Sequence, residues 1–389
     1  MSEHAMLSPS GAHRWLRCAG SVALERGTPN ESSEYARWGT AAHELSALCL
    51  NTNTNAHGYL GRVIEVEGES IHVDPEMADC VQSYVQWIRT YANGHQLLVE
   101  QRIPIGHITG EEGAAGTADA VIITTDAELQ VHDLKGGRGV AVSADTNEQL
   151  MIYALGAIAE YDLFGPFKRV RVVIHQPRVN SAPDEWDCSV EQLLEFGAKV
   201  KLRANRALGT LKVIGPNDLV PGEKQCKWCR AKASCPKLAA DVLDTFERIH
   251  PESADPISLA HAMSKVGLVE DWCKAIRAKV EADLFAGVPV AGWKLVEGKR
   301  GIRQWRDETA AEELLRTMRL KVDEMYNKKL ISPTQAEKLL KPTPRRWAKV
   351  IDQITQNDGK PSVAPESDKR PALSRADDFA DVSEQEALV

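Results

Sequence analysis

The chain has 389 residues, of which 43% are hydrophobic and 26% charged, as in an ordinary globular protein. No apolar run approaches the ~20 residues of a membrane span, and the first residues lack the apolar core of a signal peptide. We therefore expect a cytoplasmic protein, with a length typical of two domains. The net charge of −8 is unusual for a nucleic-acid binder, although such binding depends on local basic patches. Eight cysteines in a cytoplasmic chain favour metal binding over disulfides.

Two helices are predicted within the first fifty residues. The first covers residues 7–26 and carries Cys18. The second runs from about Glu34 to Leu50, and His43 lies on it among alanines and leucines. A histidine in such a setting is usually a core or surface residue, so any other role depends on its sequence context, RWGTAAHE.

A helix and a strand are predicted next. The polar, glycine-containing segment 51–73 leads to a helix from Pro75 to about Asn93. Residues 96–105, QLLVEQRIPI, have the composition of a strand and contain Glu100. We expect Glu100 to be an outward-facing strand residue. The alternative is an acidic residue that belongs to a site.

The middle of the chain predicts an antiparallel hairpin. Two runs rich in β-branched residues, TADAVIITT and LQVHDLK, flank the short polar break TDAE. If the turn centres near Asp126, Asp119 lies opposite Asp133, and opposed side chains share a face with Cβ atoms about 4.5–5.5 Å apart. Lys135 is two residues beyond Asp133 and therefore lies on the same face.

Two carboxylates this close repel each other unless a cation holds them. A divalent metal bound by carboxylate oxygens is one solution. A surface cluster neutralised by Lys135 is the other, and on the hairpin alone it is the interpretation we favour. The next segment, residues 145–163, has the apolar spacing of a helix and places Gln149 and Tyr153 on one face.

These motifs together resemble the RecB-like branch of the PD-(D/E)XK nuclease superfamily. The resemblance rests on G-T-x-x-H, G-x-x-D, D-x-K and Q-x-x-x-Y in this order, ending at His43, Asp119, Lys135 and Tyr153. It implies an α/β nuclease core with a mixed central sheet flanked by helices. Some members of the superfamily also use an acidic residue near the position of Glu100.

The resemblance also implies roles for individual residues. His43, Asp119 and Asp133 would bind Mg²⁺ or Mn²⁺, with the Leu134 carbonyl as a further ligand. The ammonium group of Lys135 would attend the attacking water. The remaining two residues of the predicted site are Gln149 and Tyr153. They would steady the site or the DNA strand.

A strand and a helix follow this core. Residues 169–176, RVRVVIHQ, predict a further strand beside the sheet. The amphipathic segment Val190 to Leu208 predicts a helix with a basic polar face, which carries Lys199, Lys201, Arg203 and Arg206. Such a face is usually only solvated. The alternative is that it borders a path for DNA.

Three cysteines follow at C-x₂-C-x₅-C spacing, namely Cys226, Cys229 and Cys235. Thiolates two residues apart in a tight turn reach a common metal. In RecB-like nucleases with an iron–sulfur cluster, related to the CRISPR-associated iron–sulfur exonucleases, one cysteine precedes the histidine element and three follow the core. This resemblance implies that Cys18 is the fourth ligand, and that a 4Fe-4S cluster, rather than zinc, staples the N-terminal helix to the end of the nuclease domain.

The C-terminal part predicts a mainly helical extension. Residues 255–287 and 332–340 have helical patterns, and residues 292–308 are basic and aromatic, as in a nucleic-acid contact or the core of a small domain. The tail from Gln356 is acidic and proline-containing, which predicts disorder. We expect a nuclease domain at residues 1–245, an extension at residues 246–350 and a disordered tail at residues 351–389.

The layout as a whole, including GWKLVEG, SPTQAEKLLK and PESDKRPAL, resembles a phage- and prophage-encoded family of unassigned function. This context implies a role in recombination or replication of phage DNA in the host cytoplasm. The predicted function is metal-dependent DNA hydrolysis by an exonuclease acting on linear ends or single strands, with a single-strand annealing or binding protein as partner. Two alternatives stay open: a non-catalytic DNA-binding protein on this fold, and a redox-responsive iron–sulfur regulator.

Overall fold

The computed structural model describes residues 5–28, 33–248, 256–294, 296, 309, 313, 317, 332–340, 344–351 and 354. The chain forms two units, Met1–Val296 (unit 1) and Glu297–Val389 (unit 2). Most of the basic segment 292–308 and of the tail 351–389 lies outside the described residues. The domain boundaries expected from the sequence stay predictions.

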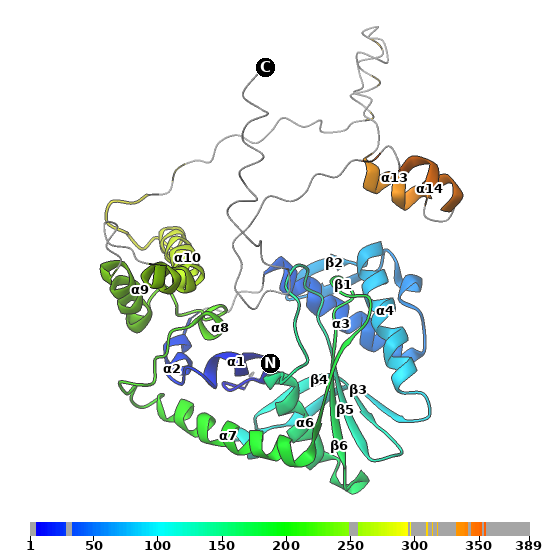
Figure 1. The fold of residues 1–389 in the computed structure, drawn as a ribbon, viewed down its shortest axis with the longest axis horizontal. Coiled ribbons are helices and arrows are strands. Elements are labelled where there is room, and N and C mark those ends of the chain that lie inside the picture. The colour runs from blue at the N-terminus through cyan, green and yellow to red at the C-terminus, as the bar shows by residue number, and fades with distance from the viewer. Residues whose placement is uncertain are drawn as a thin grey trace. The chain divides into compact units, whose positions relative to one another are not determined.

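The elements of unit 1 follow one another in mixed α/β order (Figure 1). Its helices are η1 (Pro9–Gly11), α1 (Ala12–Trp15), α2 (Ser21–Glu25), α3 (Glu34–Thr52), η2 (Ala56–Tyr59), α4 (Pro75–Tyr91), α5 (Gly106–Thr109), α6 (Glu148–Glu160), η3 (Asp162–Phe164), α7 (Val190–Gly209), α8 (Glu223–Cys226), α9 (Pro236–Arg248) and α10 (Pro256–Phe285). Its strands are β1 (Val63–Val66), β2 (Glu69–His72), β3 (Gln96–Pro104), β4 (Ala115–Ile123), β5 (Glu128–Leu134), β6 (Arg169–His175) and β7 (Asp184–Ser189). The elements described in unit 2 are α13 (Pro333–Leu340), which the sequence predicts, and α14 (Pro344–Ile351).

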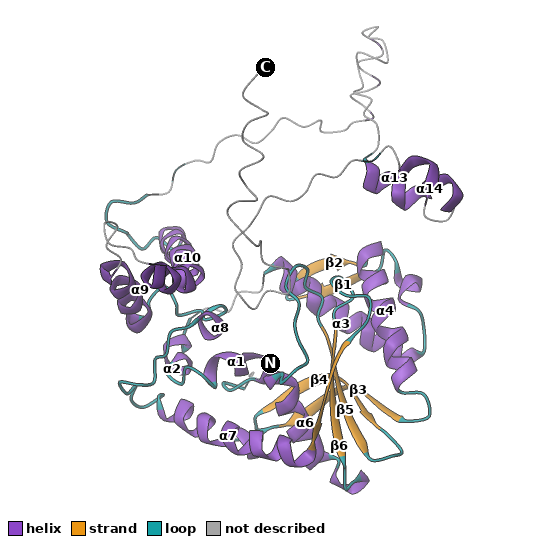
Figure 2. Cartoon of the chain, in the orientation of Figure 1, coloured by secondary structure: helices purple, strands orange, loops and turns teal. Residues whose placement is uncertain are grey.

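A mixed sheet forms the centre of unit 1. Within the described residues it has five strands in the order β3-β4-β5-β6-β7. Strands β5 and β6 are parallel, and the other neighbours are antiparallel. The predicted mixed sheet flanked by helices is therefore confirmed (Figure 2). The sequence analysis missed β7, a short edge strand whose sequence, DEWDCS, contains three acidic residues.

Two apolar clusters hold the helices on this sheet. One includes Trp15 from α1 and Leu150 from α6, packed with residues of β4, β5 and β6. The other includes Leu45 from α3 and Leu134 from β5, packed with α4. Because both clusters cover β5, all its positions are buried, including Asp133. None of the described helices combines the length and apolarity needed to cross a membrane.

The N-terminal segment departs from the single helix expected over residues 7–26. It is divided into η1, α1 and α2. Just before α2, the Gly20 N–H donates to the Asp218 carbonyl at 2.8 Å, and a Cβ on Gly20 would lie 2.6 Å from a Leu219 methyl carbon. The helix is therefore interrupted where the chain contacts a segment about 200 residues away. No local sequence pattern predicts this interruption.

Segment 51–73 contains a hairpin that the sequence analysis missed. Strands β1 and β2 pair antiparallel, with Val66 opposite Glu69. The two turn residues, Glu67 and Gly68, have left-handed φ values of 52° and 83°. A two-residue turn of this kind favours Asn-Gly or Asp-Gly, so Glu-Gly gives a weaker signal.

Helix α6 lies so close to β3 that a glycine is required at their contact. A Cβ on Gly156 would clash with the Ile103 side chain and lie 2.9 Å from the Pro104 carbonyl oxygen. Gly156→Ala should therefore lower the free energy of unfolding by about 1–3 kcal/mol, the usual effect of overpacking, in urea denaturation. The control is Gly209→Ala, where an added Cβ meets nothing within 4 Å. Equal losses in both variants would contradict the packing explanation.

Candidate metal centre

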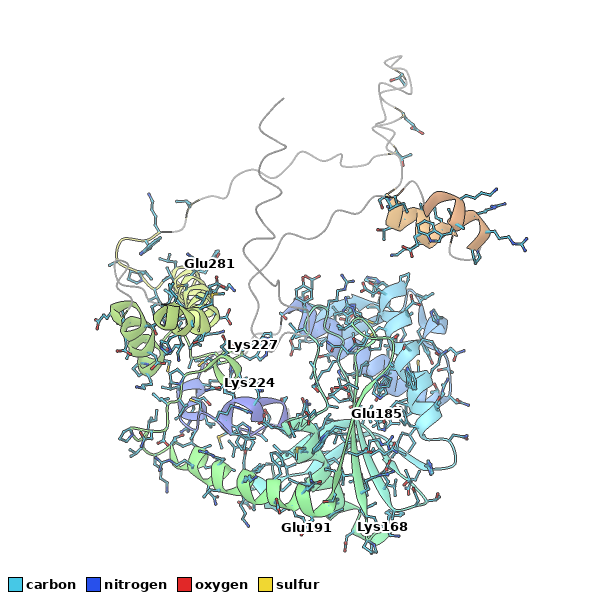
Figure 3. The ribbon with its side chains drawn as sticks, viewed as in Figure 1. Lys168, Glu185, Glu191, Lys224, Lys227 and Glu281 are labelled. Atoms are coloured by element: carbon cyan, nitrogen blue, oxygen red, sulfur yellow. The ribbon has the colours of Figure 1, made fainter. Side chains whose placement is uncertain are left out.

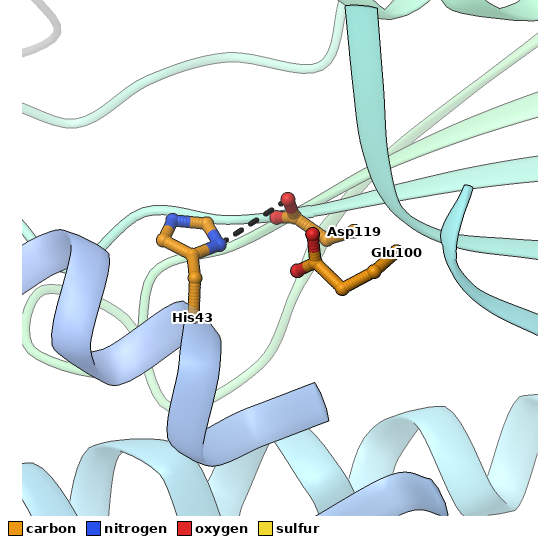
Figure 4. Close-up of side chains that lie close together, drawn as sticks. All are labelled: His43, Glu100 and Asp119. Carbon is orange, nitrogen blue, oxygen red and sulfur yellow. Dashed lines mark ion pairs between the residues drawn. The ribbon is translucent and has the colours of Figure 1, made fainter. Parts of the chain in front are cut away.

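The carboxylate of Asp119, on β4, contacts both a helix and the neighbouring strand. His43 extends from α3, and its Nδ1 atom lies 3.2 Å from Oδ1 of Asp119 on β4 (Figure 4). The other oxygen of Asp119 accepts a hydrogen bond from the backbone N–H of Leu134 on β5, at 2.6 Å. Asp119 is therefore held from both sides, between α3 and β5.

Glu100 completes a compact group with these two side chains. One ligand atom each from His43, Glu100 and Asp119 lies within 4.8 Å of the others. The backbone of Glu100 has a left-handed φ of 50°, and the β3–β4 ladder is interrupted at Glu100 and Asp119. Val99 pairs with Ala120 and Gln101 with Ala118, so Glu100 lies opposite Asp119 with no extra residue on either strand. Left-handed residues other than glycine cluster at functional sites. Glu100 is exposed, as expected of an outward-facing strand residue, but it lies close to both His43 and Asp119.

The charges in this group depend strongly on each other. Burial alone would lower the pKa of His43, but Asp119 and Asp133 outweigh it and raise that pKa to about 9. Burial would raise the pKa of Asp119, but His43, the Leu134 N–H and Lys135 lower it. Burial and the nearby Asp119 raise the pKa of Glu100 to about 7. Without a metal, an imidazolium–carboxylate pair therefore occupies the site at neutral pH.

A second hydrogen-bonded group lies beside the first. Lys135 Nζ lies 2.8 Å from Asp133 Oδ2 and 3.1 Å from Gln149 Oε1. The Gln149 amide in turn donates to Asp133 Oδ1 at 3.1 Å. Burial by itself would lower the pKa of Lys135, but Asp133 raises it, so the lysine is charged. Burial, together with Asp119, raises the pKa of Asp133.

The register of the hairpin is as the sequence predicts. Strand β4 pairs Ala120 with His132 on β5, so Asp119 and Asp133 are the next residues on the two strands. The structure brings five of the side chains assigned to the nuclease site from the sequence into two adjacent groups. His43 and Asp119 form the first with Glu100, and Asp133 forms the second with Lys135 and Gln149.

Tyr153 and Leu134 support these groups from behind. Tyr153 is buried on α6, where its ring packs so closely on Gly116 that a Cβ there would lie 2.6 Å from Tyr153 Cε1. This contact explains the glycine three residues before Asp119. Leu134 contacts Asp119 through its N–H, and a role for its carbonyl as a metal ligand stays a prediction.

The four cysteines assigned to a cluster line one small cavity. Cys18, Cys226, Cys229 and Cys235 surround it together with apolar side chains, among them Leu24. Among the described residues, no three of these sulfurs lie within 4.8 Å of one another, so the structure does not show a closed thiolate cluster. The one-plus-three arrangement along the chain nevertheless converges on one place.

Metal binding at His43 must displace a proton, because a metal takes the neutral imidazole. The pKa of His43 is raised from 6.5 to about 9. We therefore expect Mn²⁺ affinity to increase between pH 6.5 and pH 9. The released proton should be seen by calorimetry in buffers of different ionisation enthalpy. His43→Gln should bind more weakly and lose the part of this dependence that comes from the imidazole, while the part from Glu100 remains. The control is His57→Gln, which breaks a surface pair with Asp79. An unchanged pH dependence in His43→Gln would contradict the assignment.

Comparison with known proteins places the chain in a family. The crystal structure of SSO0001 is similar over 58% of this chain and 84% of that chain, with 14% sequence identity and a TM-score of 0.27, which carries no argument about function. The sequence profile of a family described as "Protein of unknown function (DUF2800)" matches residues 4–371. The likeness to a family of unassigned function over nearly the whole chain is thereby confirmed, and the chain belongs to the DUF2800 family.

Proposed function

We propose that this protein is a metal-dependent DNA nuclease that acts from DNA ends. The observation that carries the proposal is the meeting of one imidazole and two carboxylates, from His43, Glu100 and Asp119, beside the buried Asp133 and its half-buried partner Lys135. Carboxylate oxygens and imidazole suit Mg²⁺ or Mn²⁺. A charged lysine held against a carboxylate is placed to act on water or phosphate.

Each residue has a distinct role in the proposed reaction. A divalent ion bound here would supply a water of lowered pKa and would stabilise charge on the phosphate. His43, once neutral, would hold the ion with Asp119 and Asp133, and Glu100 would add a carboxylate. Lys135 orients the attacking water or neutralises the phosphate.

Two residues keep the lysine and its partner in position. Gln149 bonds to both Lys135 and Asp133, so neither side chain can turn away without losing a hydrogen bond. Tyr153 supports this part of α6 from the buried side.

We further propose that the cysteine cavity holds a 4Fe-4S cluster. Two of the four sulfurs accept backbone hydrogen bonds, Val220 N–H to Cys18 at 3.4 Å and Gly222 N–H to Cys226 at 3.5 Å. Such bonds stabilise thiolates and tune iron–sulfur centres. The long-range arrangement of one cysteine before the core and three after it favours the cluster over zinc.

The nuclease proposal predicts loss of cleavage in variants of the second group. Asp133→Asn and Lys135→Ala should each reduce cleavage of end-labelled linear DNA in Mg²⁺ or Mn²⁺ by at least about 100-fold. Asp133 would help to hold the metal and Lys135 would orient the water or neutralise the phosphate, and loss of one group that stabilises the transition state typically costs that much. The control is Asp126→Asn, on the same hairpin but fully exposed. Wild-type cleavage by Asp133→Asn would refute the site.

A second substrate tests the dependence on ends. Linear DNA should be degraded, while covalently closed duplex circles should survive under the same conditions. Rapid cutting of the circles would point to an endonuclease. No cleavage of either substrate, with DNA binding retained, would favour the non-catalytic alternative.

The cluster proposal predicts iron in the protein. Anaerobically purified protein should be brown, with about four irons per chain. Cys18→Ser should lose iron as completely as Cys229→Ser, because both would be ligands. The control is Cys80→Ser, a buried cysteine of α4 away from the cavity. Stoichiometric zinc without visible absorbance would refute the cluster, and an unaffected Cys18→Ser protein would move the fourth ligand elsewhere.

A further inference from the structure

A large cleft extends from Lys135 and Gln149, beside the candidate metal centre, to the cysteine-bearing turn. It has a volume of about 1430 Å³, and both Lys135 and Trp228 line it. The charged residues that line it are mostly basic: Arg14, Arg17, Arg26, Lys135, Lys199, Lys224, Lys227 and Arg230, against Glu25, Asp145 and Glu148. The whole chain carries a net charge of −8, so this cleft is a local exception.

Part of this positive charge is already neutralised within the protein. Arg14 and Arg230 both pair with Glu25, and Arg17 pairs with Glu148. Four other cations of the cleft are exposed and, among the described residues, form no ion pair. They are Arg26, Lys199, Lys224 and Lys227.

These exposed cations come from separate elements. Lys199 lies on α7, whereas Lys224 and Lys227, labelled in Figure 3, belong to α8 and the turn after it. Cations on two walls of one cleft favour an extended polyanion over a single small anion. A nucleic-acid backbone has this chemistry, and neutralised phosphates dominate the affinity of such contacts.

Trp228 adds an aromatic surface to the same cleft. Its side chain is 67% exposed, although the neighbouring Cys226 and Cys229 are buried. The two cysteines anchor the backbone on either side, so the indole projects from a fixed point. Lys227 lies over the ring, with Nζ 5.5 Å from its centroid. An indole beside a cation is the usual pairing on surfaces that bind unpaired bases.

We propose that the cleft binds a single nucleic-acid strand, with a base stacked on Trp228 and phosphates along Lys199, Lys224 and Lys227. The inference rests on the proposed nuclease function, because the same strand would continue to Lys135. It favours a single strand over a duplex, because the face of a paired base is covered by its neighbours. Trp228 is then the residue that distinguishes the two substrates.

Binding of labelled oligothymidylate, measured by fluorescence anisotropy in EDTA so that nothing is cut, tests this. Trp228→Ala should weaken the binding by about tenfold, as expected for loss of one base–aromatic contact. Trp228→Phe keeps an aromatic face and should stay close to the wild type. The control is Tyr35→Ala, which removes an aromatic side chain that is 83% exposed and does not line the cleft.

Two further ligands separate stacking from charge. A strand of abasic sites keeps the phosphates but has no bases, so wild type and Trp228→Ala should bind it equally. A duplex of the same length should also show no difference between them. Equal losses for the abasic strand or the duplex would overturn the stacking role, as would unchanged oligothymidylate binding by Trp228→Ala.

The outcome is independent of whether the protein cuts DNA. If wild type cleaves DNA but Trp228→Ala binds single strands normally, the stacking proposal fails alone. If Trp228 governs single-strand binding but wild type never cleaves, the nuclease proposal fails and the cleft assignment stands. Thermal unfolding of both Trp228 variants checks that the turn is intact.

Discussion

The opposition of two buried carboxylates across β4 and β5 is the constraint on which the rest of this structure depends. Like charges at that separation destabilise a fold unless cations balance them. His43 balances Asp119, and Lys135 balances Asp133. The first cation comes from α3 and the second from the end of β5, held there by Gln149 of α6. Helices of both apolar clusters must therefore meet the sheet at the same end.

A second constraint ties the N-terminal segment to the chain near residue 230. Glu25 is 4% exposed, accepts the Arg230 backbone N–H at 2.8 Å and pairs with Arg14 at 2.8 Å. A buried carboxylate that lost these partners would be left uncompensated. These contacts hold the segments that bear Cys18 and the C-x₂-C turn, and they thereby also fix Trp228. In the proposed function, the cysteine cavity and the strand-binding cleft thus depend on the same contacts.

Much of the candidate site could be predicted from local patterns. The β-branched runs and the short turn set the register that opposes Asp119 and Asp133, and helical periodicity places Gln149 and Tyr153 on one face of α6. Glu100 could not be found in this way, because its place opposite Asp119 depends on the pairing of β3 with β4, and no short turn between these strands predicts that register. Its sequence context, LLVEQRI, is that of an ordinary strand.

The sequence by itself determined strands β3 to β6, most helix boundaries and the opposed carboxylates, because alternation, periodicity and turn chemistry act between residues close along the chain. Tertiary structure alone decided that Glu100 joins His43 and Asp119, that the N-terminal helix breaks before α2, and that basic residues of α1, α7 and α8 line one cleft. These features depend on contacts between segments up to about 200 residues apart, such as the Gly20 N–H bond to Asp218. No pattern within either segment encodes such a contact, since it exists only once both have packed on the sheet.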